Sequence, residues 1–199
     1  KVVSSVAIPG QSEPVRKLAI PAGMSEPAAL AALRLELPNV HFGPNHVYHI
    51  RPANDDKTAA VPAARTDESE AGNPNCNGPQ CAAQQLIHWR PSLQQCASRV
   101  RVGIIDTSFD VTHPAFQTLK FKPDNFIGAA KPATNDWHGT AVLSVLAGAS
   151  QSPTPGLVPE AYYLLASAFA ADTAGNAAAD AMSVLRALAW LDKEKVDIV

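Results

Sequence analysis

The stretch Val102-Gly-Ile-Ile-Asp-Thr-Ser108 decides the fold of this chain. The four residues that follow Arg101 are small or β-branched and apolar, a composition that predicts a buried strand. The run stops at Asp106-Thr107-Ser108, a trio of turn-forming residues. The sequence therefore predicts a strand that carries a carboxylate at its carboxyl end.

The second informative stretch is His138-Gly-Thr-Ala-Val-Leu-Ser-Val-Leu-Ala-Gly148. Apolar residues at Val142, Val145 and Leu146 have the spacing of a helix with one buried face. Gly148 is a natural end for this helix. We therefore expect His138 to lie at the start of a helix.

An aspartate at a strand end and a histidine at a helix start can meet. In open α/β sheets, the carboxyl ends of the strands and the starts of the following helices share one edge. A carboxylate that accepts the Nδ1 proton of an imidazole fixes its tautomer and leaves Nε2 free as a general base. Asp106 and His138 thus have the chemistry of two members of a serine-protease triad.

Both stretches resemble the motifs of the subtilisin-like serine protease (subtilase) family. The resemblance lies in Ile104-Ile-Asp-Thr107, in Asp110-Val-Thr-His-Pro-Ala-Phe116 and in the whole of His138 to Gly148. It implies an α/β fold with a doubly wound parallel sheet, here incomplete, catalytic roles for Asp106 and His138, and a polypeptide substrate. No cofactor is evident, and calcium is suggested only by the family resemblance. Ser108 stands where the family nearly always has glycine, so the turn must form without glycine's conformational freedom.

The nucleophile of the triad is not in this sequence. The chain order in subtilisin is Asp, His, Ser, and the family's serine lies in a Gly-Thr-Ser-x-Ala-type helix start, a motif that these 199 residues do not contain. We therefore expect a serine endopeptidase precursor of which this chain is the front part, inactive by itself. The main alternative is a catalytically inactive, subtilase-like binding protein, and Ser108 favours it. A weaker alternative, an unrelated doubly wound ligand-binding domain, predicts that Asp106 and His138 lie far apart.

The first fifty residues predict a small α+β module. Two short β-like runs, 1–8 and 15–20, precede a helix capped by Ser25 with a buried stripe, and two strand segments follow. The stripe comprises Leu30, Leu33 and Leu37, and the strand segments are 40–42 and 47–50.

Three short motifs in this module resemble the last part of a subtilase propeptide: Pro21-Ala-Gly-Met24, Leu37-Pro-Asn-Val40 and Pro44-Asn-His-Val-Tyr48. The resemblance implies that residues 1–53 are a partial propeptide-like module that assists folding and occludes the cleft. The chain's own propeptide is then one of its partners. The alternative is a packing module with no inhibitory role.

The remaining segments complete the expected organisation. Residues 54–80 are rich in Ala, Pro, Asp, Glu, Gly and Asn, which predicts a linker and the expected site of precursor cleavage. Residues 81–199 are expected to form the N-terminal half of the catalytic domain. A helical pattern at 82–97, a strand at 162–169, a helix at 177–191 and a strand at 196–199 predict a parallel sheet.

Composition limits the other function classes. The net charge of −2 and the lack of any Lys/Arg cluster larger than a pair argue against nucleic-acid binding. No apolar run approaches the ~18 residues of a membrane span, and no signal peptide is present. Three cysteines suit an extracytoplasmic protein with one disulfide and one thiol whose partner lies outside these residues, and the turn between Cys76 and Cys81 could bring those two together. Zinc held by Cys76, Cys81, His88 and Cys96 is the alternative, but this spacing lacks the close pairs of structural zinc sites.

Overall fold

The centre of the protein is a three-stranded parallel sheet. The computed structural model describes residues 1–50, 84, 87, 89–128, 137–153 and 155–199. In it, β4 (Arg101–Asp106) and β5 (Lys120–Asn125) flank β6 (Tyr162–Ser167), in the order β4-β6-β5. The register sets Asp106 opposite Ser167 at the carboxyl end of the sheet. The predicted strands at 102–105 and 162–169 and the predicted parallel sheet are confirmed.

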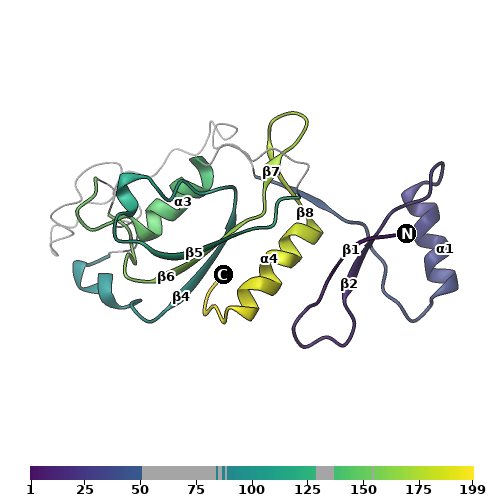
Figure 1. Ribbon diagram of the computed structural model, residues 1–199, viewed down its shortest axis with the longest axis horizontal. Coiled ribbons are helices and arrows are strands. Elements are labelled where there is room, and N and C mark those ends of the chain that lie inside the picture. Colours follow the sequence, from purple (N-terminus) through teal and green to yellow (C-terminus); the bar gives the residue numbers. More distant parts are fainter. Residues whose placement is uncertain (51–83, 85–86, 88, 129–136, 154) are drawn as a thin grey trace.

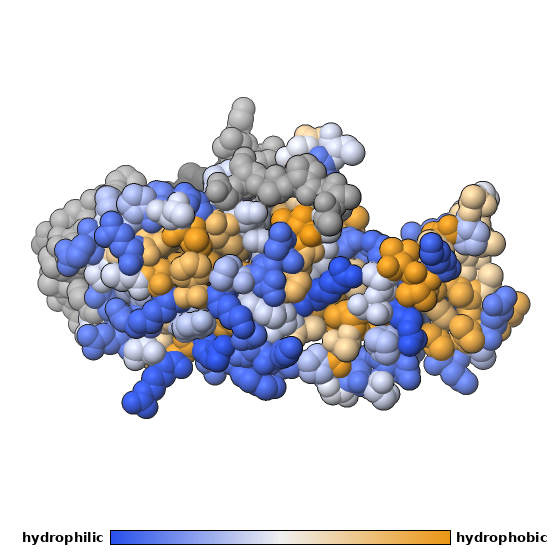
Figure 2. All heavy atoms as spheres, in the orientation of Figure 1, coloured by the Kyte–Doolittle hydropathy of each residue, from blue (hydrophilic) through white to orange (hydrophobic). Residues whose placement is uncertain are grey.

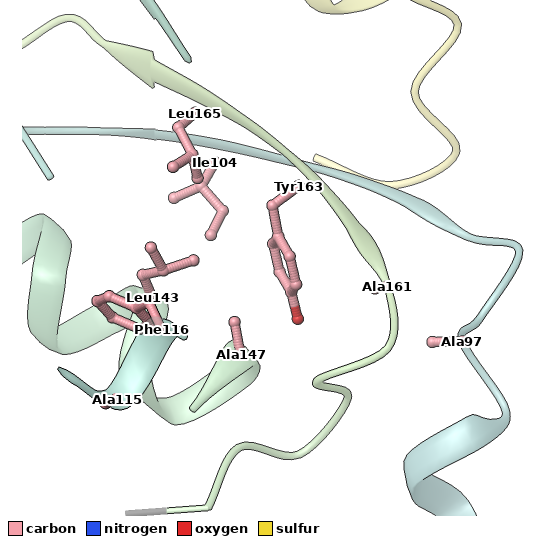
Figure 3. Packing of buried hydrophobic residues seen from close by; sticks show 9 residues of the cluster. All are labelled: Ala97, Ile104, Ala115, Phe116, Leu143, Ala147, Ala161, Tyr163 and Leu165. Atoms are coloured by element: carbon pink, nitrogen blue, oxygen red, sulfur yellow. The ribbon is translucent and has the colours of Figure 1, made fainter. Parts of the chain in front are cut away.

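Helices cover both faces of this sheet (Figure 1). On one face, α3 (Trp137–Ala147) packs against the strands, and Figure 3 shows Leu143 and Phe116 close to Ile104 and Leu165. On the other face, α4 (Ala181–Lys193) packs Ala187 and Trp190 near Ala166 and Ile105. As a result, side chains of the central strand β6 are fully buried on both faces of the sheet, as is usual for parallel sheets covered by helices on both sides.

The buried face of α3 differs from the one expected from sequence. Its buried residues are Gly139, Leu143 and Ala147, spaced four apart, whereas Val145 is 47% exposed. Val142 and Leu146 are half-buried and pack against the core cluster, as expected. The expected stripe was wrong at Val145, because periodicity gave the width of the apolar face but not which side of it meets the sheet.

Strand β5 was not expected from sequence, because its residues are mostly polar and include Pro123. The structure explains this composition, since β5 is the edge of the sheet and an edge strand tolerates proline. Two lysines of β5 form ion pairs: the Nζ of Lys120 lies 3.0 Å from Glu160, and the Nζ of Lys122 lies 2.7 Å from Glu194.

The N-terminal residues form the small α+β arrangement that was expected. β1 (Val2–Val6) pairs antiparallel with β2 (Val15–Leu18), and α1 (Glu26–Glu36) follows. Ser25 caps α1, because its Oγ accepts a hydrogen bond from the backbone nitrogen of Ala28. Residues 40–42, expected as a strand, form none in the structure.

The apolar stripe of α1 is only partly covered. Ala29 is its one buried residue, Leu30 and Leu33 are half-buried, and Leu35 and Leu37 are exposed. Hydrophobic surface is visible over this part of the molecule, at the right of Figure 2. Leu37 was therefore wrongly expected to be buried. A two-stranded sheet and one helix have too little surface to enclose a core of their own.

A third sheet joins the N-terminal residues to the rest of the chain. β3 (Val47–His49) pairs antiparallel with β8 (Ala177–Asp180), which also pairs with β7 (Ala170–Ala171). The helix expected from Ala177 therefore begins only at Ala181. Backbone pairing with β3 and β7 overrides the helical preference of alanine in β8.

Asp180 is the polar centre of this junction. Its carboxylate accepts hydrogen bonds from Lys17 Nζ (2.6 Å), Asn45 Nδ2 (3.1 Å) and the backbone nitrogen of Ser183 (2.8 Å). Partial burial alone raises the pKa of Asp180, but the bonds from Lys17, Ser183 and Asn45 outweigh burial and hold that pKa below its usual range. A cavity of about 310 Å³ lies alongside, lined by Leu30 and Met182 among others. These bonds therefore connect β2 and the segment before β3 to the start of α4.

Two expectations fall wholly or partly outside the described residues. The linker at 54–80, with Cys76 and Cys81, and His88 of the zinc alternative lie outside the described residues. Within the helical pattern expected at 82–97, Gln84 is helical and a short 3₁₀ helix, η3 (Pro91–Gln95), follows. Cys96 comes next, exposed and with no disulfide to any residue that the structure describes. Among the described residues, no helix has the length and apolarity needed to cross a membrane.

Leu143→Ala tests the core. Leu143 is fully buried between α3 and the sheet, so its truncation is expected to lower the free energy of unfolding by about 2–5 kcal/mol. Denaturant unfolding measures this change. Val145→Ala, on the exposed side of the same helix, is the control and is expected to cost less than about 1 kcal/mol. Equal losses in the two variants would contradict the packing described.

Asp180→Asn tests the junction, because asparagine can still cap α4 but loses the charge that faces Lys17. A lowered pKa means that the carboxylate stabilises the fold above its ordinary pKa and that this contribution is lost as the pH falls. At pH 7 the variant is expected to be less stable by about 1–3 kcal/mol. The difference should decrease below about pH 4, measured by unfolding at several pH values. Glu36→Gln, at an exposed carboxylate, is the control; a difference independent of pH would count against the ion pair.

Candidate active site

Asp106 is the last residue of β4 and is buried. Its Oδ1 accepts a hydrogen bond of 2.6 Å from the backbone nitrogen of Thr107. After β6, the backbone nitrogens of Ala168 and Phe169 also donate to the carbonyl of Asp106, at 2.8 and 3.2 Å. Both the main chain and the side chain of this residue are therefore held in place.

His138 lies beside this carboxylate. Its Nδ1 is 2.8 Å from Asp106 Oδ1, and the two side chains are 29% and 9% exposed, respectively. An ionised carboxylate only accepts hydrogen bonds, so Nδ1 must carry the proton in this contact. Nε2 of the neutral ring then keeps its lone pair, which is the arrangement that a general base needs. The expectation that the two side chains meet is confirmed.

A close approach of backbones brings the two residues together. The backbone nitrogen of Gly139 donates to Thr107 Oγ1 at 2.9 Å. A Cβ at Gly139 would lie 2.7 Å from the carbonyl oxygen of Ser108 and 3.1 Å from that of Thr107. Only glycine leaves room for the start of α3 to lie this close to the turn after β4.

A second hydrogen bond supports the same contact. The backbone nitrogen of Asp110 donates to Thr140 Oγ1 at 2.8 Å. Thr107, Gly139 and Thr140 therefore position the pair, although sequence reasoning assigned no role to any of them. Their place in the sequence was the available signal: Thr107 directly follows Asp106, and Gly139 and Thr140 directly follow His138.

Ser108 does not need glycine's freedom. Among the described residues other than glycine, only Lys195 has a positive φ. The turn after Asp106 therefore uses backbone angles that serine adopts without strain. The turn with Ser108 therefore leaves the carboxylate of Asp106 within hydrogen-bond distance of His138.

The loop after the turn is held by its own side chains. Asp110 Oδ1 accepts hydrogen bonds from the hydroxyl and the backbone nitrogen of Thr112, at 2.6 and 3.0 Å. The hydroxyl bond is the main reason why the pKa of Asp110 is lowered. His113 Nδ1 accepts from the backbone nitrogen of Ala115 at 3.2 Å and caps η4 (Pro114–Phe116). His113 thus shapes the loop.

The far end of α3 is anchored by residues 156–158. Their backbone nitrogens donate to the last carbonyls of the helix: Gly156 to Gly148, Leu157 to Val145 and Val158 to Leu146, at 2.7–2.9 Å. A Cβ at Gly156 would lie 2.5 Å from Leu146 O. These bonds satisfy carbonyls that a helix end leaves unpaired, so both ends of α3 are fixed.

The described residues contain no group of three or more His, Cys, Asp or Glu side chains that could hold a metal ion. Of the other histidines, His49 lies with its Nδ1 3.7 Å from Asp172 Oδ2, at the junction of β3 with the β7–β8 hairpin. The structure therefore brings together Asp106 and His138 and leaves His49 and His113 in other places.

Comparison of the sequence with protein-family models and with curated proteins found no match. The interpretation of the site therefore depends on its motifs and on the geometry described above.

Gly139→Ala tests the close approach. The added methyl group would collide with the carbonyl of Ser108, so the start of α3 must move and the contact between Asp106 and His138 should lengthen or break. The downfield NMR signal of the His138 Nδ1 proton is expected to weaken or disappear. Gly128→Ala is the matched control, since a Cβ there meets nothing within 4 Å. An unchanged signal in Gly139→Ala would show that the approach is less tight than described.

Proposed function

We propose that this chain is the front part of a subtilisin-like serine endopeptidase precursor, with Asp106 and His138 as two members of its triad. The observation that carries the proposal is the 2.8 Å contact between His138 Nδ1 and Asp106 Oδ1. The contact joins a strand end to a helix start within motifs that resemble those of subtilases. The two residues are 32 positions apart in the sequence, so nearness along the chain does not explain their contact.

In the proposed reaction, His138 Nε2 takes the proton of a serine hydroxyl as the serine oxygen attacks the peptide carbonyl carbon. The same proton then passes from His138 to the leaving amine as the peptide bond breaks, and water releases the acyl group in a second round. Asp106 keeps the imidazole in the required tautomer and stabilises its charged form. The serine and the oxyanion donors must come from outside these 199 residues, so we expect no hydrolysis by this chain alone.

The N-terminal residues are proposed to act as a propeptide-like inhibitor. Support comes from β3, which adds to the edge of β8 by antiparallel pairing from Val47 to His49. β7 begins three residues after Ser167, the residue paired with Asp106, so this hairpin sheet lies beyond the carboxyl end of the parallel sheet. A strand in this place suits a segment that blocks the approach of an extended polypeptide. The same proposal includes export of the protein from the cytoplasm.

The alternatives make different predictions. An unrelated doubly wound ligand-binding domain predicts that Asp106 and His138 are far apart, which disagrees with the distance measured between them. A catalytically inactive, subtilase-like binding protein predicts the same pair without a nucleophile, and only an activity measurement on the complete gene product separates it from the enzyme.

The test is hydrolysis of fluorogenic peptides by the product of the complete reading frame. His138→Ala is expected to lower kcat by roughly 10⁶-fold, because it removes the base, and Asp106→Asn by roughly 10⁴-fold, because it removes the group that orients the base. Val145→Ala, on the exposed side of α3, should leave kcat unchanged. Full activity in His138→Ala would overturn the proposal. A folded gene product without hydrolytic activity would instead favour the binding protein.

A further inference from the structure

An exposed tryptophan lies directly beside the candidate general base. Trp137 is the first residue of α3 and is 53% exposed. Its indole packs edge-on against the imidazole of His138, with ring centroids 5.7 Å apart and an interplanar angle of 75°. A large apolar surface thus faces solvent next to the proposed reaction centre.

The other two tryptophans are used differently. Trp89 is buried, and its Nε1 donates to the carbonyl of Leu157 at 2.7 Å. Trp190 is half-buried and packs against Phe126 with centroids 5.6 Å apart. Both stabilise the fold through contacts of the indole with the protein. More than half of Trp137 has no such cover, although burial of apolar surface is worth about 25 cal/mol per Å².

The position of Trp137 indicates what could cover it. A general base must lie within hydrogen-bond reach of the nucleophile and later of the leaving amine. A substrate therefore passes over the open edge of the imidazole, and the side chains that flank the scissile bond come within contact distance of a ring centred 5.7 Å away. Trp137, whose ring contacts that of His138, is therefore placed to touch a substrate side chain beside the scissile bond.

We propose that Trp137 is a specificity-determining residue that forms one wall of a subsite for a large apolar, preferably aromatic, side chain next to the scissile bond. The proposal rests on the proposed function, because it takes His138 as the general base. An apolar side chain suits the subsite better than a cationic one, because a cation would need a carboxylate to pair with. The two described carboxylates nearest in sequence to the turn after β4, Asp106 and Asp110, already accept hydrogen bonds from other groups. Among the residues that the structure describes, apolar contact and ring packing are therefore the main attractions available.

The test is an NMR titration of the 199-residue chain, with ¹⁵N-labelled tryptophan and histidine. The probes are N-acetyl-phenylalanine amide, N-acetyl-lysine amide and N-acetyl-glycine amide at millimolar concentrations. The Trp137 indole signal, assigned with Trp137→Phe, is expected to shift and saturate with the phenylalanine probe. The apparent affinity should be roughly two- to tenfold higher than for the other two probes. The indole signals of Trp89 and Trp190 are internal controls and should not move.

A second readout keeps the test valid if indole signals overlap. The ring signals of His138 should also shift with the phenylalanine probe, and Trp137→Ala should weaken this response at least about twofold. Val145→Ala should respond like the unaltered chain. The proposal is overturned if the phenylalanine probe leaves the Trp137 signal unmoved, if all three indoles shift alike, or if the lysine probe binds most tightly. The hydrolysis assay depends on His138 and this titration on Trp137, so each proposal can fail separately.

Discussion

The close approach between the start of α3 and the turn after β4 is the constraint on which the candidate site depends. Gly139 allows it, because any side chain there would collide with the carbonyl of Ser108. Once the backbones lie this close, the residue before Gly139 projects its imidazole at the carboxylate that ends β4. Leu143 and the bonds from residues 156–158 hold the rest of the helix against the sheet. The pairing of Asp106 with His138 is therefore a product of how the helix docks.

Much of this centre could be predicted from the sequence, because its signals are local. The apolar run before Asp106 and the glycine at 148 set the ends of a strand and a helix, and the order of strands and helices gave a parallel sheet. The centre of the buried face of α3, at Leu143 and not at Val145, could not be predicted, since it depends on residues 156–158 and on which side of the helix meets the sheet. Periodicity alone carries no information about such distant partners.

Distant tertiary partners also account for the wrong expectations elsewhere in the chain. Ala177 to Asp180 consists of residues that favour a helix or its cap, yet β3, 130 residues earlier in the sequence, draws them into a strand. Lys120 to Asn125 shows no strand pattern, because an edge strand exposed to solvent needs little apolar character. Both errors arise where a tertiary partner outweighs local preference. The site was predictable because its strong local patterns and its tertiary contacts agree.

The contact between β3 and β8 has a consequence for how the protein is made. Asn45 and Asp180, which meet at this contact, are 135 positions apart, so a ribosome synthesises the first long before the second. During that interval β3 has an unpaired edge, and the leucines of α1 have little to cover them. Unpaired edges and exposed apolar side chains favour association between nascent chains. The contact also closes a very long loop, and non-local pairings of this kind form slowly. The nascent N-terminal segment therefore needs protection until α4 has left the ribosome.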